Sequence, residues 1–255
     1  MSLEEDIVNG SNGLCTTDLS LITKPLVVRG VAERKKIRSC REQNRDFYYT
    51  DTGYFGNFTS QGNPGGKKLF LRIVKNDLQK HWTDHFPPDR WKELVKIDPR
   101  LNWSGWKIGR RRGNKILLVL PNPKACAFYE LDFETWKNNT IETIKSHTDM
   151  PIVVREKNGR GQRHHYSIYN ALDEGVFATV AFNSIAAIES IAYGVPAFVS
   201  VPCAASPLAL SDLTKITTPY YPDESLVNKH CCSLAYGQFT HEEIANGTAW
   251  RLLNQ

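Results

Sequence analysis

The sequence alternates short apolar runs with longer polar or amphipathic segments. In the second half, apolar runs predict strands at residues 115–120, 151–154, 177–182 and 196–201. The first of them, KILLVL, has no polar alternation, which is typical of a parallel strand that is covered on both faces. The segments at 133–147 and 185–193 predict helices between these strands, and Gly194 ends the second helix.

The first half follows the same order on a smaller scale. Residues 25–28 and 46–51 predict two strands, and residues 32–43 between them have a helix-forming composition. Strand, helix and strand fit within about thirty residues, the size of a βαβ unit. A further strand is predicted at 67–74.

Strands that alternate with helices at this spacing favour an α/β fold with two Rossmann-like parallel-sheet units, of which the N-terminal one is reduced. The basic turn at 109–114 marks a boundary between them. We therefore expect an N-terminal unit at 1–112, a second unit at 113–238 and a helical tail at 239–255. Thr240 and Glu243 have the capping-box spacing for a helix in that tail.

The charge of the chain is divided unevenly between its halves. Of the 255 residues, 41% are hydrophobic and 23% are charged, which is the composition of a globular protein. Residues 1–115 contain 22 Lys and Arg against 13 Asp and Glu, whereas residues 116–255 contain 10 against 14. A basic first half suits an anionic partner. A solvated face that carries the excess explains the same counts equally well.

Several classes of protein are disfavoured by what the sequence lacks. No apolar run reaches about 18 residues, so no transmembrane helix is expected, and the start MSLEED is unlike a secretory signal. The six cysteines form no CxxC pair, so we expect neither a zinc finger nor a disulfide framework, and a reducing, cytoplasmic compartment. GxGxxG, P-loop and GxSxG motifs are absent, which disfavours NAD, ATP and serine-hydrolase chemistry.

Candidate ligand-binding residues follow two of the predicted strands. Asn183 and Ser184 come directly after the strand at 177–182, at a helix N-terminus, where free N–H groups and the helix dipole attract anions. An ordinary helix cap explains the same residues. Glu189 lies in an otherwise apolar helix, where a ribose diol would give its carboxylate two hydrogen-bond donors; alternatively, it faces water.

A basic segment follows the strand at 151–154. Arg155 and Lys157 could reach a diphosphate that is bound at the start of the Ser184 helix. The basic segment continues with Arg160, Arg163, His164 and His165. The two adjacent histidines lack the i, i+4 spacing of a helical zinc site, so no metal is expected there.

The segment NSIAAIESIAYGVPAF at 183–198 resembles the donor-side motif of GT-B glycosyltransferases. In that family, a strand leads to a Ser-rich helix start, then to a Glu, and then to Gly-x-Pro before the next strand. The likeness covers about residues 110–210 and is similar in character to capsule-type polysaccharide transferases and bacteriophage DNA-base sugar transferases.

The resemblance implies a donor site and an acceptor site in different units. Ser184 and its neighbours would contact phosphate, and Glu189 would hold the ribose of a nucleotide sugar such as a UDP-sugar. The acceptor and the base would belong to the N-terminal unit, which agrees with the charge division. The family typically uses cationic side chains and a helix dipole where others use a metal ion, so neither a metal nor a cofactor is expected.

Asp51 is the candidate catalytic base. It ends the predicted strand at 46–51 and would point into the cleft between the units, where its carboxylate could take a proton from an acceptor hydroxyl. The sugar would then transfer by direct displacement with inversion. The alternative is a turn aspartate that fixes the Asp-Thr-Gly loop. Weaker candidates for the base are His81, Asp84 and His85.

The acceptor surface is predicted from basic clusters with aromatic residues near them. The cations are Arg110, Arg111, Arg112, Arg34, Lys35, Lys36, Arg38, Arg41, Lys67 and Lys68, and the aromatic residues are Tyr48, Tyr54, Phe55, Trp103 and Trp106. Such a surface suits double-stranded DNA with a flipped, hydroxymethylated pyrimidine, in the host cytoplasm if the protein is phage-encoded. The alternatives are a glycan or lipid-linked saccharide acceptor, a nucleotide-sugar epimerase or hydrolase, and a non-enzymatic DNA-binding protein.

Overall fold

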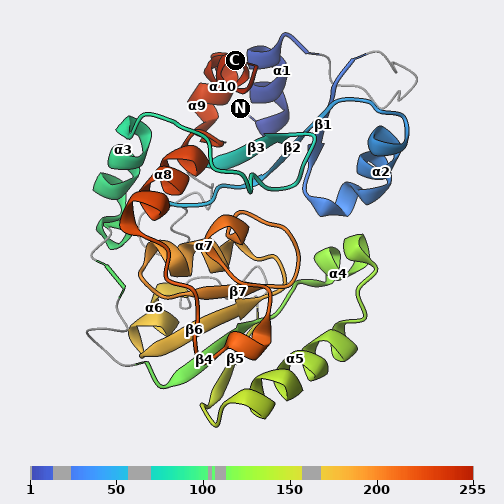
Figure 1. Cartoon of the computed structure of the whole chain (residues 1–255). Helices are drawn as coiled ribbons and strands as arrows, with labels where there is room; N and C mark the ends of the chain where they lie inside the picture. The colour runs from blue at the N-terminus through green and yellow to red at the C-terminus, as the bar shows by residue number, and fades with distance from the viewer. Residues whose placement is uncertain are drawn as a thin grey trace.

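The computed structural model describes residues 2–13, 24–56, 70–102, 105–106, 113–156 and 168–254. It contains two sheets, one above the other in Figure 1. The N-terminal sheet contains β1 (Leu26–Arg29), β2 (Phe47–Thr52), β3 (Leu71–Lys75) and β8 (Gln238–Phe239). The C-terminal sheet contains β4 (Lys115–Val119), β5 (Ile152–Arg155), β6 (Val176–Ala181) and β7 (Ala197–Val199).

The C-terminal sheet is parallel throughout, in the order β5-β4-β6-β7. The inner strand β4 is covered on both faces, because Ile116 and Leu118 pack in one apolar cluster and Leu117 and Val119 in another. On one face lies the amphipathic helix α5 (Phe133–His147), and on the other lie α6 (Ile168–Asp173) and α7 (Ile185–Ala192). The predicted α/β class and the buried central strand are confirmed.

The N-terminal sheet is mixed, in the order β1-β2-β3-β8. Only β1 and β2 are parallel; β3 is antiparallel to β2, and β8 is antiparallel to β3. The unit is Rossmann-like over β1, α2 (Arg34–Glu42) and β2, with the short helix η1 (Val31–Glu33) before α2. An apolar run predicts a strand but not its direction, so the antiparallel additions were not predictable from the sequence.

The C-terminal tail packs on the N-terminal sheet. Helices α9 (His241–Ala245) and α10 (Thr248–Leu253) lie beside α1 (Leu3–Ser11) at the top of Figure 1. A Cβ on Gly10 would lie 1.6 Å from the carbonyl oxygen of Ile244, so only glycine permits this close approach. The predicted capping box is present, since Thr240 Oγ1 accepts from the Glu243 N–H and the Glu243 carboxylate accepts from the Thr240 N–H.

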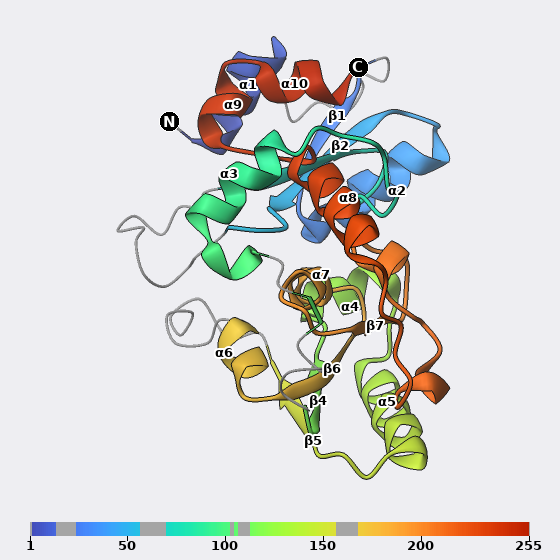
Figure 2. The same cartoon turned by 60° about the vertical axis from the view of Figure 1, so that its left-hand side comes forward.

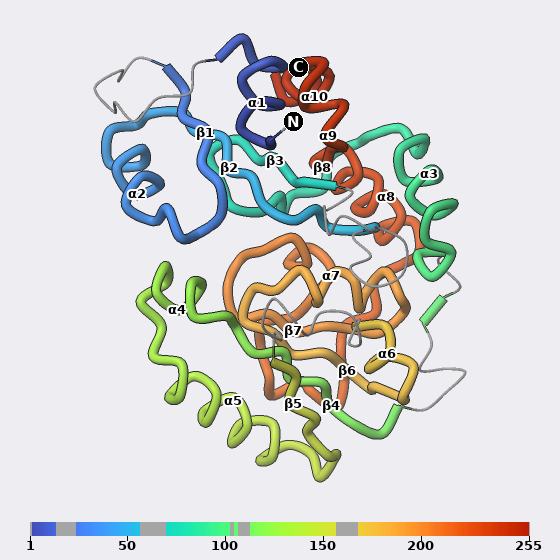
Figure 3. Tube along the Cα trace, turned by 180° about the vertical axis from the view of Figure 1, so that it is seen from behind, coloured from blue at the N-terminus to red at the C-terminus, as the bar shows by residue number. Residues whose placement is uncertain are grey.

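Two helices join the units on the side that is turned forward in Figure 2. Helix α8 (Glu224–Ala235) leads from the C-terminal unit back to β8 and packs against α3 (Asp89–Ile97), which continues into η2 (Pro99–Leu101). On the opposite side, α4 (Pro123–Tyr129) lies next to α2 (Figure 3). The remaining short helices are η4 (Ser206–Leu208) and η5 (Leu213–Lys215).

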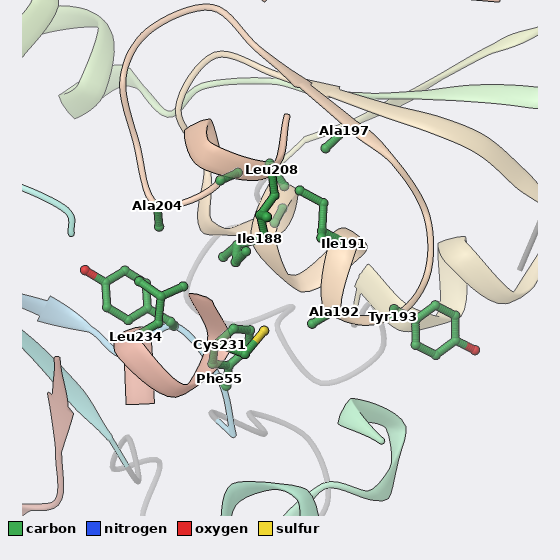
Figure 4. Close-up of a cluster of buried hydrophobic side chains, with 14 of the residues drawn as sticks. Phe55, Ile188, Ile191, Ala192, Tyr193, Ala197, Ala204, Leu208, Cys231 and Leu234 are labelled. Atoms are coloured by element: carbon green, nitrogen blue, oxygen red, sulfur yellow. The ribbon is translucent and has the colours of Figure 1, made fainter. Parts of the chain in front are cut away.

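One apolar core belongs to both units. Phe55 comes from the N-terminal unit, and it packs in the same cluster as Ile188 and Ile191 of α7 and Cys231 and Leu234 of α8 (Figure 4). Such a shared core holds the polar residues at its edges in a defined geometry. None of the helices in the described ranges is long and apolar enough to cross a bilayer.

Candidate functional site

The carboxyl ends of the C-terminal strands face the N-terminal unit. After β6, Ser184 is the N-cap of α7, and its hydroxyl oxygen accepts a hydrogen bond from the Ala186 N–H at 3.2 Å. The Ser184 hydroxyl is therefore engaged as an ordinary cap. Its position at the start of a helix, at the end of a parallel strand, is also the usual position of a ligand in an open α/β sheet.

Asn183 is held by both units. Its carbonyl oxygen accepts from Gln79 Nε2 at 2.7 Å, and the Gln79 Oε1 atom accepts from the Ala204 N–H at 3.1 Å. The Asn183 side chain lies near the phenol of Tyr129, at the end of α4, and lowers its pKa. One buried amide from the N-terminal unit thus fixes the residues that follow β6 and β7.

Two charged residues of the N-terminal unit lie near Tyr129. Burial raises the pKa of the Tyr129 phenol, the negative charge of Asp77 adds to the rise, and the positive charge of Arg41 opposes it. Asp77 also lies 3.5 Å from His81 Nδ1. We call the residues Arg41, Asp77, Gln79, Tyr129 and Asn183 the Asn183 cluster.

A second polar cluster surrounds Glu189. This residue of α7 is partly exposed, and burial raises the pKa of its carboxyl from 4.5 to about 7. The positive charges of Arg155 and Arg100 oppose the rise, and the negative charge of Asp98 adds to it. Burial in turn lowers the pKa of Arg155, at the end of β5, while Glu189 opposes that change.

The charged residues around Glu189 come from both units. Arg100 follows α3 and pairs with the buried Asp98 at 2.8 Å between Nε and Oδ1. Its guanidinium lies 4.2 Å from the ring centroid of Tyr169 on α6. We use the name Glu189 cluster for Asp98, Arg100, Arg155, Tyr169 and Glu189. Glu189 therefore lies among protein charges, not in bulk water, and a carboxylate with a pKa about 7 is the kind of group that a ligand can stabilise in its charged form.

Asp51 is half-exposed near the end of β2. Its carboxylate accepts from the Thr52 N–H at 2.7 Å and from the Tyr49 hydroxyl at 3.1 Å. Arg72 lies 3.4 Å away, and this buried guanidinium also donates to the Thr52 and Leu78 carbonyl oxygens. The bond to Thr52 is the local turn contact of a structural aspartate, so a role for Asp51 as a base stays a prediction.

Three of the aromatic residues predicted for the acceptor surface, Tyr48, Tyr54 and Phe55, lie in the interior. Tyr54 is fully buried and its hydroxyl oxygen accepts from the Lys80 N–H at 2.7 Å, so the predicted contact of Tyr54 with an acceptor is wrong. Phe55 is equally buried, and Tyr48 bonds Asn254 on the tail side of the sheet. Trp106 donates to the Pro222 carbonyl oxygen at 3.2 Å. The chain after β2 turns into the shared core, which accounts for the burial of Tyr54 and Phe55.

Some predicted residues lie outside the described ranges, and their roles stay predictions. These are Lys67, Lys68, Trp103, Arg110, Arg111, Arg112, Lys157, Arg160, Arg163, His164 and His165. Among the weaker base candidates, Asp84 pairs with Lys80 at 2.8 Å and His85 is exposed.

Sequence reasoning missed the residues that connect the units. Gln79, Asp98, Arg100 and Tyr129 have no local motif that marks them. His230 is a further example: it is fully buried on α8, its Nε2–H donates to the Ala204 carbonyl oxygen at 2.6 Å, and its Nδ1 lies 3.1 Å from the Thr83 hydroxyl. Burial lowers the pKa of His230 to about 4, so it is neutral at ordinary pH.

Comparison with known proteins supports the fold. No family model and no curated protein sequence matches the chain. A solved structure of the KpsC β-Kdo 2,4 transferase of Thermosulfurimonas dismutans covers 84% of this chain, with 80% of its own length, 13% identity and a TM-score of 0.51. The KpsC β-Kdo 2,7 transferase of the same organism covers 91%, with 85% of its own length, 13% identity and a TM-score of 0.49. The chain is therefore similar in fold to the KpsC β-Kdo 2,4 transferase.

Proposed function

We propose that this protein is a glycosyltransferase that moves a sugar from a nucleotide sugar to an acceptor hydroxyl. The observation that carries the proposal is the Glu189 cluster. A partly exposed carboxylate with a raised pKa lies near Arg155. Glu189 belongs to the helix that carries the donor-side motif, and Arg155 ends the strand whose basic continuation we expect to reach the diphosphate. The glycosyltransferase fold of the structural neighbour is consistent with it.

In this proposal the donor binds through its phosphate and its ribose. The start of α7, with Asn183 and Ser184, receives the phosphates, and Arg155 contributes positive charge. Lys157, outside the described residues, is predicted to contribute a second cation. Glu189 accepts hydrogen bonds from the ribose hydroxyls, which stabilise its ionised form. The cations and the helix dipole then stabilise the leaving phosphate without a metal ion.

The transfer step needs a base. Asp51 takes the proton of the acceptor hydroxyl while the oxygen bonds to the anomeric carbon, and the bond from that carbon to the donor phosphate breaks with inversion. Support for this role comes from the chain around Asp51. Its carboxylate is half-exposed, and the residues that follow it enter the core that both units share.

The proposed acceptor is a hydroxymethylated pyrimidine in DNA. What supports it is the surplus of nine positive charges in residues 1–115. A sugar hydroxyl of a glycan is the second candidate, favoured by the fold similarity to a protein that is named a Kdo transferase. Mass spectrometry of the acceptor after reaction with a nucleotide sugar distinguishes the two.

Donor binding is tested by a thermal-shift panel of nucleotides and of UDP-, GDP-, ADP-, TDP- and CMP-sugars. We expect at least one of them to raise the melting temperature of the wild type, and Glu189→Ala to abolish that rise. Glu142→Ala removes an exposed carboxylate on α5 and is the matched control, which keeps the rise. If no member of the panel stabilises the wild type, the transferase proposal is refuted.

A further inference from the structure

The most basic element in the described part of the chain is α2. Its nine residues, RKKIRSCRE, contain five cations and one acid. The two buried residues, Ile37 and Cys40, pack against β1 and β2. The charged residues are therefore left for the surface of the helix.

Three of these cations form one row. Arg34, Arg38 and Arg41 are spaced i, i+4 and i+7, which places them on one face of a helix. Lys35 and Lys36 lie about 100° and 200° around the axis from Arg34, at 100° per residue. We call Arg34, Arg38 and Arg41 the arginine row.

The arginine row runs along the junction between the units. Arg38 donates to the Phe128 carbonyl oxygen at 3.0 Å and pairs with Glu130 at 2.9 Å, at the end of α4. Arg41 and Asn183 both lie close enough to Tyr129 to lower the pKa of its phenol. The row thus leads from the exposed start of α2 to the Asn183 cluster, and Figures 1 and 3 both show α2 next to α4.

Most of this charge is available to a ligand. Arg34 and Arg41 are exposed and form no ion pair within the described residues. The partner of Arg38, Glu130, is 74% exposed, so solvent screens that pair. Guanidinium groups bind phosphate in a bidentate manner, which a lysine ammonium does not.

The length of the row fits a nucleic acid strand. Seven residues of helix separate Arg34 from Arg41, which is about 10 Å along the axis. One strand of B-DNA presents a phosphate about every 3.4 Å of the duplex axis, and its phosphates lie farther apart than this because the strand winds around the axis. A row about 10 Å long therefore spans about two consecutive phosphates.

We infer that the arginine row is the surface that binds the phosphate backbone of a DNA acceptor and guides the strand to the Asn183 cluster. This inference rests on the proposed function, since it names the acceptor contacts of the same site. It does not depend on the aromatic residues that the structure places in the core.

The test is fluorescence anisotropy with a labelled 20-base-pair duplex, between 50 and 200 mM salt and without donor. The test variant is Arg34→Gln/Arg41→Gln. The matched control is Lys35→Gln/Lys36→Gln, with the same change in charge on the same helix. Arg38 is left in place because it bonds α4. The melting temperature of each protein without ligand confirms that it is folded.

We expect the test variant to bind the duplex at least about tenfold more weakly at 50 mM salt. The slope of log K against log salt should fall by about 2 in magnitude, because each lost phosphate contact removes about 1. The control should keep the wild-type slope. Equal losses in both variants, or a wild type that does not bind the duplex, would overturn the inference.

A carboxylated polysaccharide such as polygalacturonate is the competing ligand. If it displaces the duplex from the wild type at equal charge concentration, and binds the test variant more weakly, the row is a glycan site and the inference is wrong. Donor binding is measured separately by thermal shift in the same proteins. A wild type that binds DNA through the row but no nucleotide sugar would refute the transferase proposal alone.

Discussion

Glu189→Gln tests the Glu189 cluster directly, because it removes a charge and keeps the shape. The pKa of the Glu189 carboxyl is raised in the folded protein from 4.5 to about 7. The folded state therefore binds a proton that the unfolded state releases, and wild-type stability falls as pH rises through this window. The total loss in the free energy of unfolding is about 3 kcal/mol, since one pKa unit corresponds to about 1.4 kcal/mol.

Glu189→Gln has no carboxyl to titrate, so its free energy of unfolding does not fall in this way. The difference in stability between the variant and the wild type therefore grows with pH. Most of this difference, about 2–3 kcal/mol, arises between pH 5 and pH 8. For a chain of this size that corresponds to about 5–10 °C in melting temperature. Melting curves of the wild type and Glu189→Gln at the two pH values measure this difference in melting temperature. Glu142→Gln, which changes an exposed carboxylate, is the control, and its difference from the wild type should not depend on pH.

The result that would refute the reasoning is an unchanged difference between variant and wild type at pH 5 and pH 8. In that case Glu189 does not titrate near neutral pH, and the packing around it does not disfavour its charge.

The titration of Glu189 also predicts how the affinity for a nucleotide depends on pH. If ribose hydroxyls stabilise the ionised form, the nucleotide Kd rises about tenfold for each pH unit below 7 and is constant above it, as isothermal titration calorimetry would measure.

Three further substitutions test other parts of the structure. Asp51→Asn should abolish sugar transfer in a product assay while leaving the thermal shift with the donor intact; transfer at the wild-type rate would remove Asp51 from the mechanism. Gln79→Ala leaves the Asn183 carbonyl and the Ala204 N–H without their partner, at about 1–3 kcal/mol for each buried group; urea denaturation measures the loss, and a change no larger than that of the exposed Gln43→Ala would contradict it. Gly10→Ala places a Cβ 1.6 Å from the Ile244 carbonyl oxygen, so α1 should separate from α9 and limited proteolysis should cleave the N-terminus faster; an unchanged cleavage rate would show that the two helices adjust without separating.

The elements that the sequence alone determined are those with a local pattern. The helix predicted at 133–147 is α5, and the strand predicted at 115–120 is β4 within one residue. Helix α5 has a cap at Asp132 and an amphipathic period, and β4 has an unbroken apolar run. These patterns lie within a few neighbouring residues, so the helix and the strand can be predicted without knowledge of distant contacts.

Helix α8 is an element that local sequence patterns do not predict. Its last six residues, from His230 to Ala235, are all buried, because the helix lies between the two units. A helical segment that is buried on every side has no amphipathic period, so the sequence did not predict this helix. The pairing of β8 with β3 is equally nonlocal, since the two strands are more than 160 residues apart.

The candidate site divides in the same way. The sequence determined which residue types follow the parallel strands, and so it predicted Asn183, Ser184, Glu189 and Arg155 as candidates. Only the tertiary structure decided what surrounds them, because Gln79, Asp98 and Arg100 come from the other unit. Asp51 and Tyr54 are three residues apart in the chain, yet one is half-exposed and the other fully buried. That difference depends on how the two units pack, and packing between distant segments leaves no periodic signal in the sequence.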